Sequence, residues 1–226
     1  MHPYDLNTNE PLSERLQPYL STHPVLGAVL QHPLVYSVPY HPMMAGLLNA
    51  QLAQKELRLS EAVSSGDWSQ AILLHERPWR VQAIAQYASA MNDPSYWRVV
   101  AWAYTDSENV NENFELWGEL LNADRPARNL MMTSAEREVL AGLPEQIKVF
   151  RGDVRKVATD YSWTIERDVA VWFAKRTARL EKRSRSLVLE GLVAKQHVIA
   201  YKASRNESEL IVAPHHVAIS QTCAVA

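Results

Sequence analysis

Two glutamates separated by one residue, Glu207 and Glu209, come directly before the apolar run 210–212. Alternate side chains of a strand point to one face, so an extended chain would place the two carboxylates together, about 6 to 7 Å apart along the backbone. Two carboxylates this close can hold different protonation states in one site. The pair could therefore combine stabilisation of a positive centre with general-base catalysis.

Two further segments of the same region carry polar side chains on strand-like runs. Arg151 ends the run 148–151 and is followed by Gly152. Ser162 and Thr164 flank Trp163, and strand alternation would put both hydroxyls on one face and the indole on the other. Taken singly, the three segments also fit a solvated arginine, an ordinary strand and an exposed acidic edge.

In their order, the three segments resemble the R-S-E class of mono-ADP-ribosyltransferases, which includes cholera-like and clostridial-type toxins and small enzymes of bacteria and their phages. The resemblance covers roughly residues 130–213. It includes Leu143-Pro144 before the arginine segment and the pattern Ala-x-x-Phe-Ala, at 170–174, after the serine segment. Trp163 departs from the family pattern, because it stands in the middle of the usual Ser-Thr-Ser.

The resemblance implies distinct roles for the two glutamates. Cleavage of the bond between nicotinamide and ribose creates an oxocarbenium-like centre, and Glu209 would stabilise that charge as carboxylates do in glycoside hydrolysis. Glu207 would act as the general base for the acceptor. The family's Glu-x-Glu pattern is associated with arginine as acceptor, so the implied reaction is transfer of ADP-ribose from NAD to a protein arginine.

The remaining site residues also follow from the resemblance. Arg151 would hold a phosphate or the ribose of NAD, Gly152 would let the backbone approach the nicotinamide amide, and Ser162 would orient the catalytic glutamate or the ribose. The implied NAD contacts are Arg151, Gly152, Ser162, Trp163, Thr164, Arg179 and Arg183. Tyr201 and Arg205, in the position of the family's substrate-recognition loop, would contact the acceptor. NAD is a substrate in this scheme, and no metal is expected.

Glycine is scarce, with 7 residues in 226. The glycines lie at least nine residues apart, which excludes both the G-x-G-x-x-G turn of Rossmann domains and the G-x-x-x-x-G-K of P-loops. Any nucleotide must therefore be held without a glycine-rich loop.

Charge is divided unevenly along the chain, although the net charge is only −2. Residues 1–140 carry 9 Lys/Arg against 16 Asp/Glu, while residues 141–226 carry 14 against 9. Six of these cations fall between 175 and 185. They fit a solvated helix end, a contact with the pyrophosphate of NAD, or an RNA acceptor.

The hydrophobic period changes near residue 145. Helical spacing before it predicts helices at 44–63, 67–74, 78–90, 95–104, 114–121 and 133–142. Asp67 and Asp93 are expected to be N-caps, and Thr133 and Glu136 have the spacing of a capping box. Short β-branched and aromatic runs after it predict strands at 148–151, 161–164, 186–193, 197–201, 209–213 and 217–222, with one helix at 166–180. Helices followed by mostly antiparallel strands indicate an α+β fold, here of ADP-ribosyltransferase type.

The expected organisation is an N-terminal helical and extended region, 1–66, followed by a catalytic domain, 67–226. A sheet of the size of 144–226 would be marginal alone, so the helical part 67–143 is expected to pack on it. The first 40 residues give no clear pattern. Their recurrent His-Pro pairs indicate turns rather than metal ligands.

Several features favour a cytoplasmic protein that does not bind membranes. No apolar run approaches the length of a membrane span, no signal peptide is visible, and Cys223 has no partner for an internal disulfide. Three other functions remain open. The chain could transfer ADP-ribose to RNA or DNA, it could hydrolyse NAD with water as acceptor, or it could be a noncatalytic module that binds nucleic acid and protein.

Overall fold

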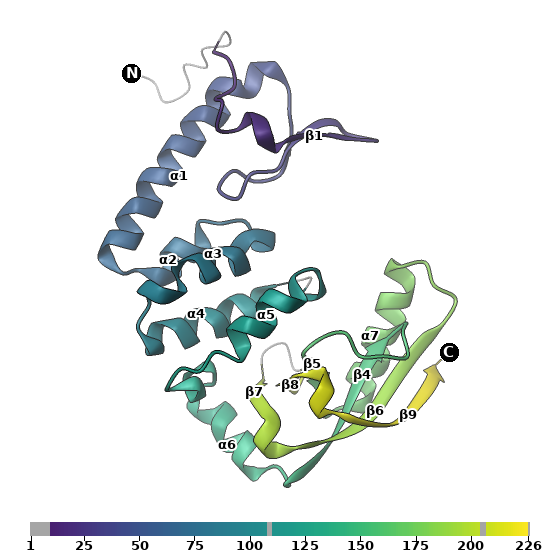
Figure 1. Cartoon of the computed structure of the whole chain (residues 1–226). Coiled ribbons are helices and arrows are strands. Elements are labelled where there is room, and N and C mark those ends of the chain that lie inside the picture. Colours follow the sequence, from purple (N-terminus) through teal and green to yellow (C-terminus); the bar gives the residue numbers. More distant parts are fainter. Residues whose placement is uncertain (1–9, 108–109, 204–206, 226) are drawn as a thin grey trace. The chain divides into compact units, whose positions relative to one another are not determined.

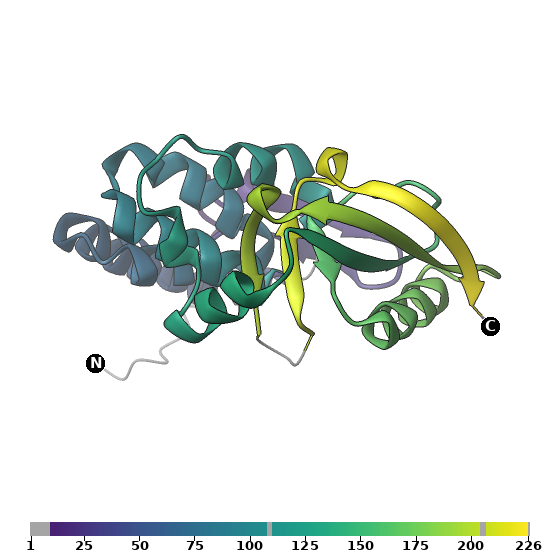
Figure 2. The same ribbon diagram turned by 90° about the horizontal axis from the view of Figure 1, so that it is seen from below.

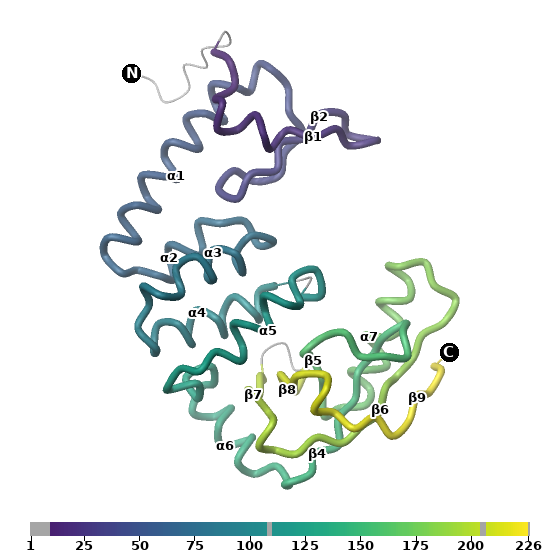
Figure 3. The backbone as a smooth tube through the Cα atoms, in the orientation of Figure 1, coloured from purple at the N-terminus to yellow at the C-terminus, as the bar shows by residue number. Residues whose placement is uncertain are grey.

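The computed structural model describes residues 10–107, 110–203 and 207–225. The chain forms two compact units, Met1–Ser95 and Tyr96–Ala226. Its elements are labelled in Figure 1, and Figure 3 traces the same backbone as a tube. Within the described residues, no helix combines the length and apolar character needed to cross a membrane.

The first unit joins a small sheet to helices. Strands β1 (Leu20–His23), β2 (Gly27–Leu30) and β3 (Val38–Pro39) form an antiparallel three-stranded sheet, which the sequence did not predict. Helices α1 (Ala45–Ser65), α2 (Trp68–Leu73) and α3 (Arg80–Tyr87) follow at the predicted places. As predicted, Asp67 caps α2, because its carboxylate accepts a hydrogen bond from the N–H of Gln70.

The His-Pro pairs that the structure describes, which begin at 23, 32 and 41, lie at turns and loop breaks, as predicted. The Nδ1 atoms of His23, His32 and His41 each accept a hydrogen bond from the backbone N–H two residues further on. Each imidazole therefore replaces a backbone acceptor in a turn, in the way that Asn and Asp side chains do. This requires an unprotonated Nδ1.

The unit boundary lies between Ser95 and Tyr96, whereas the predicted division lies between 66 and 67. Helix α2 groups with α1 because the two share apolar contacts, and α3 in turn packs on α2. Leu74, which follows α2, lies in one buried cluster with Leu48 and Leu52 of α1. The sheet of the second unit is instead accompanied by helices that begin with α4.

The second unit contains helices α4 (Asp93–Asp106), α5 (Phe114–Leu121), α6 (Ser134–Gly142) and α7 (Arg167–Leu180). The first residues of α4 belong to the first unit. The start of α4 differs from the prediction in one detail: the cap is Asn92, whose side-chain oxygen accepts from the N–H of Ser95, and not Asp93.

All strand pairs of the second unit are antiparallel, in one six-stranded sheet of order β7-β8-β5-β4-β6-β9. The strands are β4 (Gln146–Asp153), β5 (Ser162–Thr164), β6 (Ser186–Ala194), β7 (Val198–Lys202), β8 (Glu209–Val212) and β9 (Ala218–Val225). Each lies within three residues of its predicted bounds. The predicted α+β fold class is confirmed, and Figure 2 shows α7 lying along the curved sheet.

Alternate side chains of the strands pack on two sides of the sheet. Val149, Trp163 and Leu210 belong to a larger cluster, while Phe150 and Val188 pack against Ala170 and Ala174 of α7. The small alanines of α7 allow the helix to approach the strands closely. The sheet is therefore covered by α7 on the side opposite its main core.

Glu136 ties helix α6 to the end of strand β7. Its carboxylate closes the predicted capping box with Thr133 and also accepts from the N–H of Ala203 and from Nζ of Lys202, at 3.0 and 3.4 Å. Burial raises the pKa of Glu136, but the hydrogen bonds from Thr133 and Ala203 and the Lys202 ammonium outweigh it, so that the net pKa lies below the ordinary value.

Replacing Glu136 with alanine is expected to lower the free energy of unfolding by about 3 kcal/mol, because Lys202 would lose its carboxylate while buried. Since folding depresses the pKa of Glu136, its contribution is present above about pH 4.5 and is lost as pH falls through the lower folded value. Urea titrations from pH 7 to pH 3 measure this, with Glu145→Ala, in an exposed pair with Lys195, as control. Equal acid sensitivity of wild type and Glu136→Ala would contradict the assignment.

Candidate functional site

The second unit contains a cleft of about 610 Å³, a volume in the range of ligand-binding sites. Its walls come from the end of α4 and the segment after it, from β4 and β5, from α7, and from the residues just before β8. Among its lining residues are the four predicted catalytic residues, Arg151, Ser162, Glu207 and Glu209. Three segments separated in sequence thus converge on one cavity.

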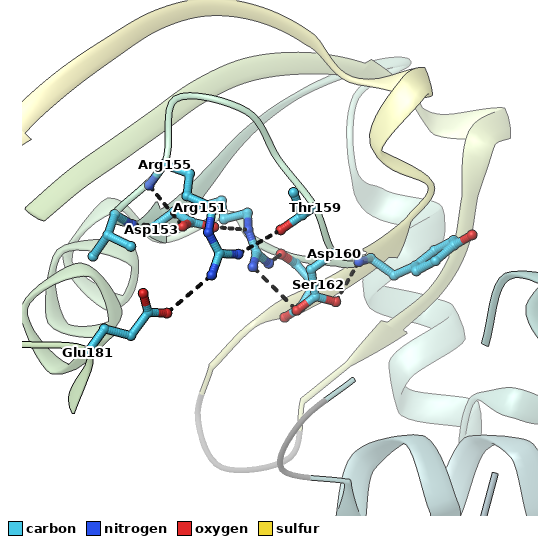
Figure 4. A network of polar contacts seen from close by, with 9 residues as sticks. Arg151, Asp153, Arg155, Thr159, Asp160, Ser162 and Glu181 are labelled. Carbon is cyan, nitrogen blue, oxygen red and sulfur yellow. Dashed lines mark hydrogen bonds and ion pairs between the residues drawn. The ribbon is translucent and has the colours of Figure 1, made fainter. Parts of the chain in front are cut away.

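Arg151 lies at the centre of a polar network on the cleft wall (Figure 4). Its Nε and Nη2 atoms lie 3.3 Å from the carboxylates of Asp153 and Asp160, and Nη1 donates to the carbonyl of Ser162 at 2.8 Å. The side chain is only 10% exposed. A guanidinium has five N–H donors, so this network leaves donors for a ligand while it fixes the position of the group.

The network links β4 to the start of β5. Asp160 accepts from the N–H of Tyr161, and Asp153 accepts from the N–H groups of Val154 and Arg155. Arg151 therefore also neutralises two carboxylates that are nearly buried. Its role as a structural cation was not predicted from the sequence.

Gly152 has a packing function that was not predicted from the sequence. A Cβ at this position would lie 2.1 Å from the carbonyl oxygen of Ala170 and 2.4 Å from the backbone nitrogen of Ala174. These distances are far below van der Waals contact, so a glycine is required for α7 to rest on β4. The close approach that Gly152 permits is to a helix of this chain.

Strand β5 presents its side chains as the alternation predicts. Trp163 also borders the cleft, while its side chain is 1% exposed and packs in the main core, so its assignment as an NAD contact stays a prediction. Thr164 lines the cleft, and its hydroxyl donates to the carbonyl of Glu207 at 2.7 Å and accepts from the N–H of Glu166 at 3.0 Å. Thr164 thus positions the glutamate segment and the start of α7.

Glu207 and Glu209 both line the cleft, but not because they share one extended strand. Strand β8 begins at Glu209, and Ser208 has a φ of 43°, in the left-handed region that residues with a side chain rarely adopt. The hydroxyl of Ser208 bonds to Glu166, and its carbonyl accepts from the N–H of Ile165. Contacts with the segment after β5 therefore hold this strained turn.

Tyr104, near the end of α4, was not predicted as a site residue. It lines the cleft and is 3% exposed, and its phenol oxygen has no hydrogen-bond partner among the described residues. Burial, together with the nearby charges of Asp160 and Glu209, raises the pKa of Tyr104 well above its ordinary value, so the phenol is a neutral donor. A buried hydroxyl without a partner is costly, which points to a partner that arrives with a ligand.

The basic residues of the cleft differ from those predicted. Arg155 and Arg176 line it, whereas Arg179 and Arg183 do not, and Arg183 instead pairs with Glu181 at 3.7 Å. Among the described residues, Arg176 has no hydrogen bond or ion pair, and its guanidinium lies 5.7 Å from the ring centroid of Trp172. A helical signal was present, because Arg176 follows the cleft residues Val169 and Phe173 by seven and three positions.

Of the two predicted acceptor contacts, the structure describes only Tyr201. Tyr201 is 6% exposed and belongs to the main core, so its side chain is not available to an acceptor, which corrects that assignment. Its position in β7 explains this, because the inward face of that strand packs on Trp163 and its neighbours. Arg205 lies outside the described residues.

Comparisons of this chain with protein-family models, with curated proteins and with solved structures found no match.

Proposed function

We propose that the chain is a mono-ADP-ribosyltransferase, with a catalytic unit of ADP-ribosyltransferase type, that transfers ADP-ribose from NAD to a macromolecular acceptor and releases nicotinamide. One observation carries the proposal: Arg151, Ser162, Glu207 and Glu209, which come from three segments, line a single cleft. Chance similarity of short motifs gives no reason for such convergence.

The chemistry requires a negative charge beside the ribose carbon that loses nicotinamide. Glu209 is held at the first residue of β8, opposite Thr164 of β5, and so has a fixed backbone position on the cleft wall. A fixed carboxylate stabilises a developing oxocarbenium ion without the reorganisation that water would need. Glu209 is therefore our assignment for this role.

The acceptor must lose a proton as its nucleophilic atom forms the new bond to the ribose. Glu207 lies two residues away, and its backbone carbonyl is fixed by Thr164. A positioned carboxylate can take the proton as a general base. This role suits an arginine side chain, as the family resemblance implies, and equally suits other acceptors with an ionisable N–H or O–H.

The cleft also offers groups that fit the rest of NAD. Arg176 can pair with a phosphate without first breaking an ion pair to a described residue. The buried phenol of Tyr104 can donate to a ribose hydroxyl or an amide oxygen. Both contacts hold a dinucleotide without the glycine-rich loop that the sequence lacks.

Incubation of the purified protein with NAD labelled in the adenylate group, with and without cell lysate, tests the proposal. The expected result is nicotinamide release and covalent label on a macromolecule. Free ADP-ribose with no macromolecular adduct would indicate an NAD glycohydrolase instead. Absence of both nicotinamide release and an NAD-dependent thermal shift would replace the enzyme with a noncatalytic binding module.

Replacing Tyr104 with phenylalanine is expected to raise the KM for NAD about tenfold, because one hydrogen bond to the ligand is lost. The free energy of unfolding is expected to stay the same or rise, since the hydroxyl bonds to no described residue. Steady-state kinetics and urea denaturation measure the two effects.

Tyr96 on the same helix provides the matched control, because its hydroxyl donates to the carbonyl of Leu120 at 2.8 Å. Tyr96→Phe is expected to cost about 1 kcal/mol of stability and to leave the KM unchanged. Loss of stability in Tyr104→Phe with an unchanged KM would show that the Tyr104 hydroxyl serves the fold.

A further inference from the structure

We propose that the outer face of α7 and the residues that follow it bind single-stranded nucleic acid, and that this nucleic acid is the acceptor of ADP-ribose; the inference rests on the function proposed above. We call this surface the α7 ridge, defined by Trp172, Lys175, Arg176, Arg179, Lys182, Arg183 and Arg185. Its features are an exposed indole, a run of cations and a border with the cleft.

The ridge follows from the amphipathic pattern of α7. Ala170, Ala174 and Ala178 are buried, and Phe173 and Thr177 line the cleft, so the positions on the opposite side of the helix turn outward. Trp172, Lys175, Arg176 and Arg179 recur at three- and four-residue spacing and form one exposed face. The indole of Trp172 is 57% exposed on this face, and its ring centroid lies 4.9 Å from that of Phe173.

Charge on the ridge is strongly one-sided. Residues 175–185 contain six Lys or Arg and one acidic residue, Glu181, which pairs with Arg155 and Arg183. The positive field is therefore not cancelled locally. A polyanion gains affinity on such a surface by releasing its counterions.

The ridge borders the cleft directly. Arg176, Thr177, Leu180 and Glu181 line the cavity, while Trp172 lies within reach of Arg176 at 5.7 Å. A strand bound along the ridge would therefore have nucleotides close to the reacting ribose. The location of the ridge beside the cleft therefore suits a nucleic acid that is also the acceptor.

Single-stranded nucleic acid fits this combination better than a protein arginine does. Exposed aromatic rings stack on bases whatever their sequence, and adjacent cations follow the phosphates. An acceptor arginine is itself a cation and would be repelled by the six positive side chains of the ridge. The indole beside a guanidinium, Trp172 with Arg176, is the arrangement that a nucleobase can use on its face.

In the proposed transfer, a hydroxyl or amino group of a nucleotide attacks the ribose carbon that carries nicotinamide. The new carbon–oxygen or carbon–nitrogen bond forms as the carbon–nitrogen bond to nicotinamide breaks. Nicotinamide leaves as the neutral base with the bonding electron pair, and the proton of the acceptor passes to Glu207. No oxidant, reductant or metal enters the balance.

Fluorescence anisotropy with a labelled single-stranded RNA of mixed sequence tests the binding, and the same strand as DNA is compared. Affinity is expected to fall with salt by a slope of about −0.7 for each phosphate neutralised. Trp172→Ala is expected to weaken binding about tenfold through lost stacking. The double variant Lys175→Glu, Arg185→Glu is expected to weaken it further and to reduce the salt slope.

Nicotinamide release in the absence of acceptor separates this inference from the proposed function. Neither Lys175 nor Arg185 lines the cleft, so release by the double variant is expected to equal that of wild type, whereas label on RNA falls in proportion to binding. Trp102→Ala, which removes a tryptophan 37% exposed on α4, is the matched control for Trp172→Ala. It is expected to change neither nicotinamide release nor the label on RNA.

Two results would overturn the acceptor assignment while the enzyme assignment stands: nicotinamide release with label on proteins alone, or RNA binding that Trp172→Ala and the double variant leave unchanged. Absence of nicotinamide release by the wild type would remove the proposed function, and this inference with it.

Discussion

Glu209→Gln is expected to lower nicotinamide release by about a thousandfold and to abolish transfer with it, because the neutral amide cannot stabilise the charge that develops on the ribose. Glu207→Gln is expected to retain nicotinamide release to water and to lose transfer to the acceptor. The difference arises because only transfer requires an acceptor to be deprotonated by Glu207.

Nicotinamide release and label on the acceptor, followed in parallel for both variants, measure this contrast. The cleft supplies a matched control in Glu181, whose carboxylate also lines it but pairs with Arg155 and Arg183 at the rim. Glu181→Gln is expected to change the turnover less than tenfold, since no reacting atom depends on it. Wild-type release by Glu209→Gln would exclude the assigned mechanism.

Arg151→Ala is expected to destabilise the protein by about 3 to 5 kcal/mol, beyond any effect on NAD. Asp153 and Asp160 are 3% and 9% exposed, and both would lose their cation while buried. The carbonyl of Ser162 would lose a donor as well. Urea denaturation monitored by tryptophan fluorescence measures the loss.

A triple variant distinguishes destabilisation by unpaired buried carboxylates from destabilisation by a simple loss of side-chain volume. Adding Asp153→Asn and Asp160→Asn to Arg151→Ala removes the unpaired charges, so part of the stability is expected to return. Arg155→Ala is the control for a nearby arginine, because its partner Glu181 is solvent-exposed, and a cost below about 1 kcal/mol is expected. No recovery in the triple variant would refute the role of Arg151 as a neutralising cation.

Local signals made the helices and strands predictable. The capping box of Thr133 and Glu136 and the Asp67 cap each depend on contacts within three residues, and both are present. The small sheet β1-β2-β3 was missed because its strands are short and partly exposed, so they lack an alternating apolar pattern. The unit boundary was not predicted either, since the helices on both sides of it have similar composition.

For the site, too, some features were predictable from the sequence and others were not. The family-like order of Arg151, Ser162, Glu207 and Glu209 anticipated a common site, and the cleft brings them together. The reasons for their placement were not visible in the sequence. They include the bond from Thr164 to Glu207, the left-handed turn at Ser208, and the two carboxylates held by Arg151.

The sequence alone determined the α+β fold class, the absence of a glycine-rich nucleotide loop and the concentration of cations between 175 and 185, because these depend on local pattern and composition. Tertiary structure decided which side chains face the cleft. Tyr104 of α4 and Arg176 line the cleft, Arg179 does not, and Tyr201 is buried in the core. The direction of a side chain into a cavity depends on contacts between distant segments, and no local pattern records those contacts.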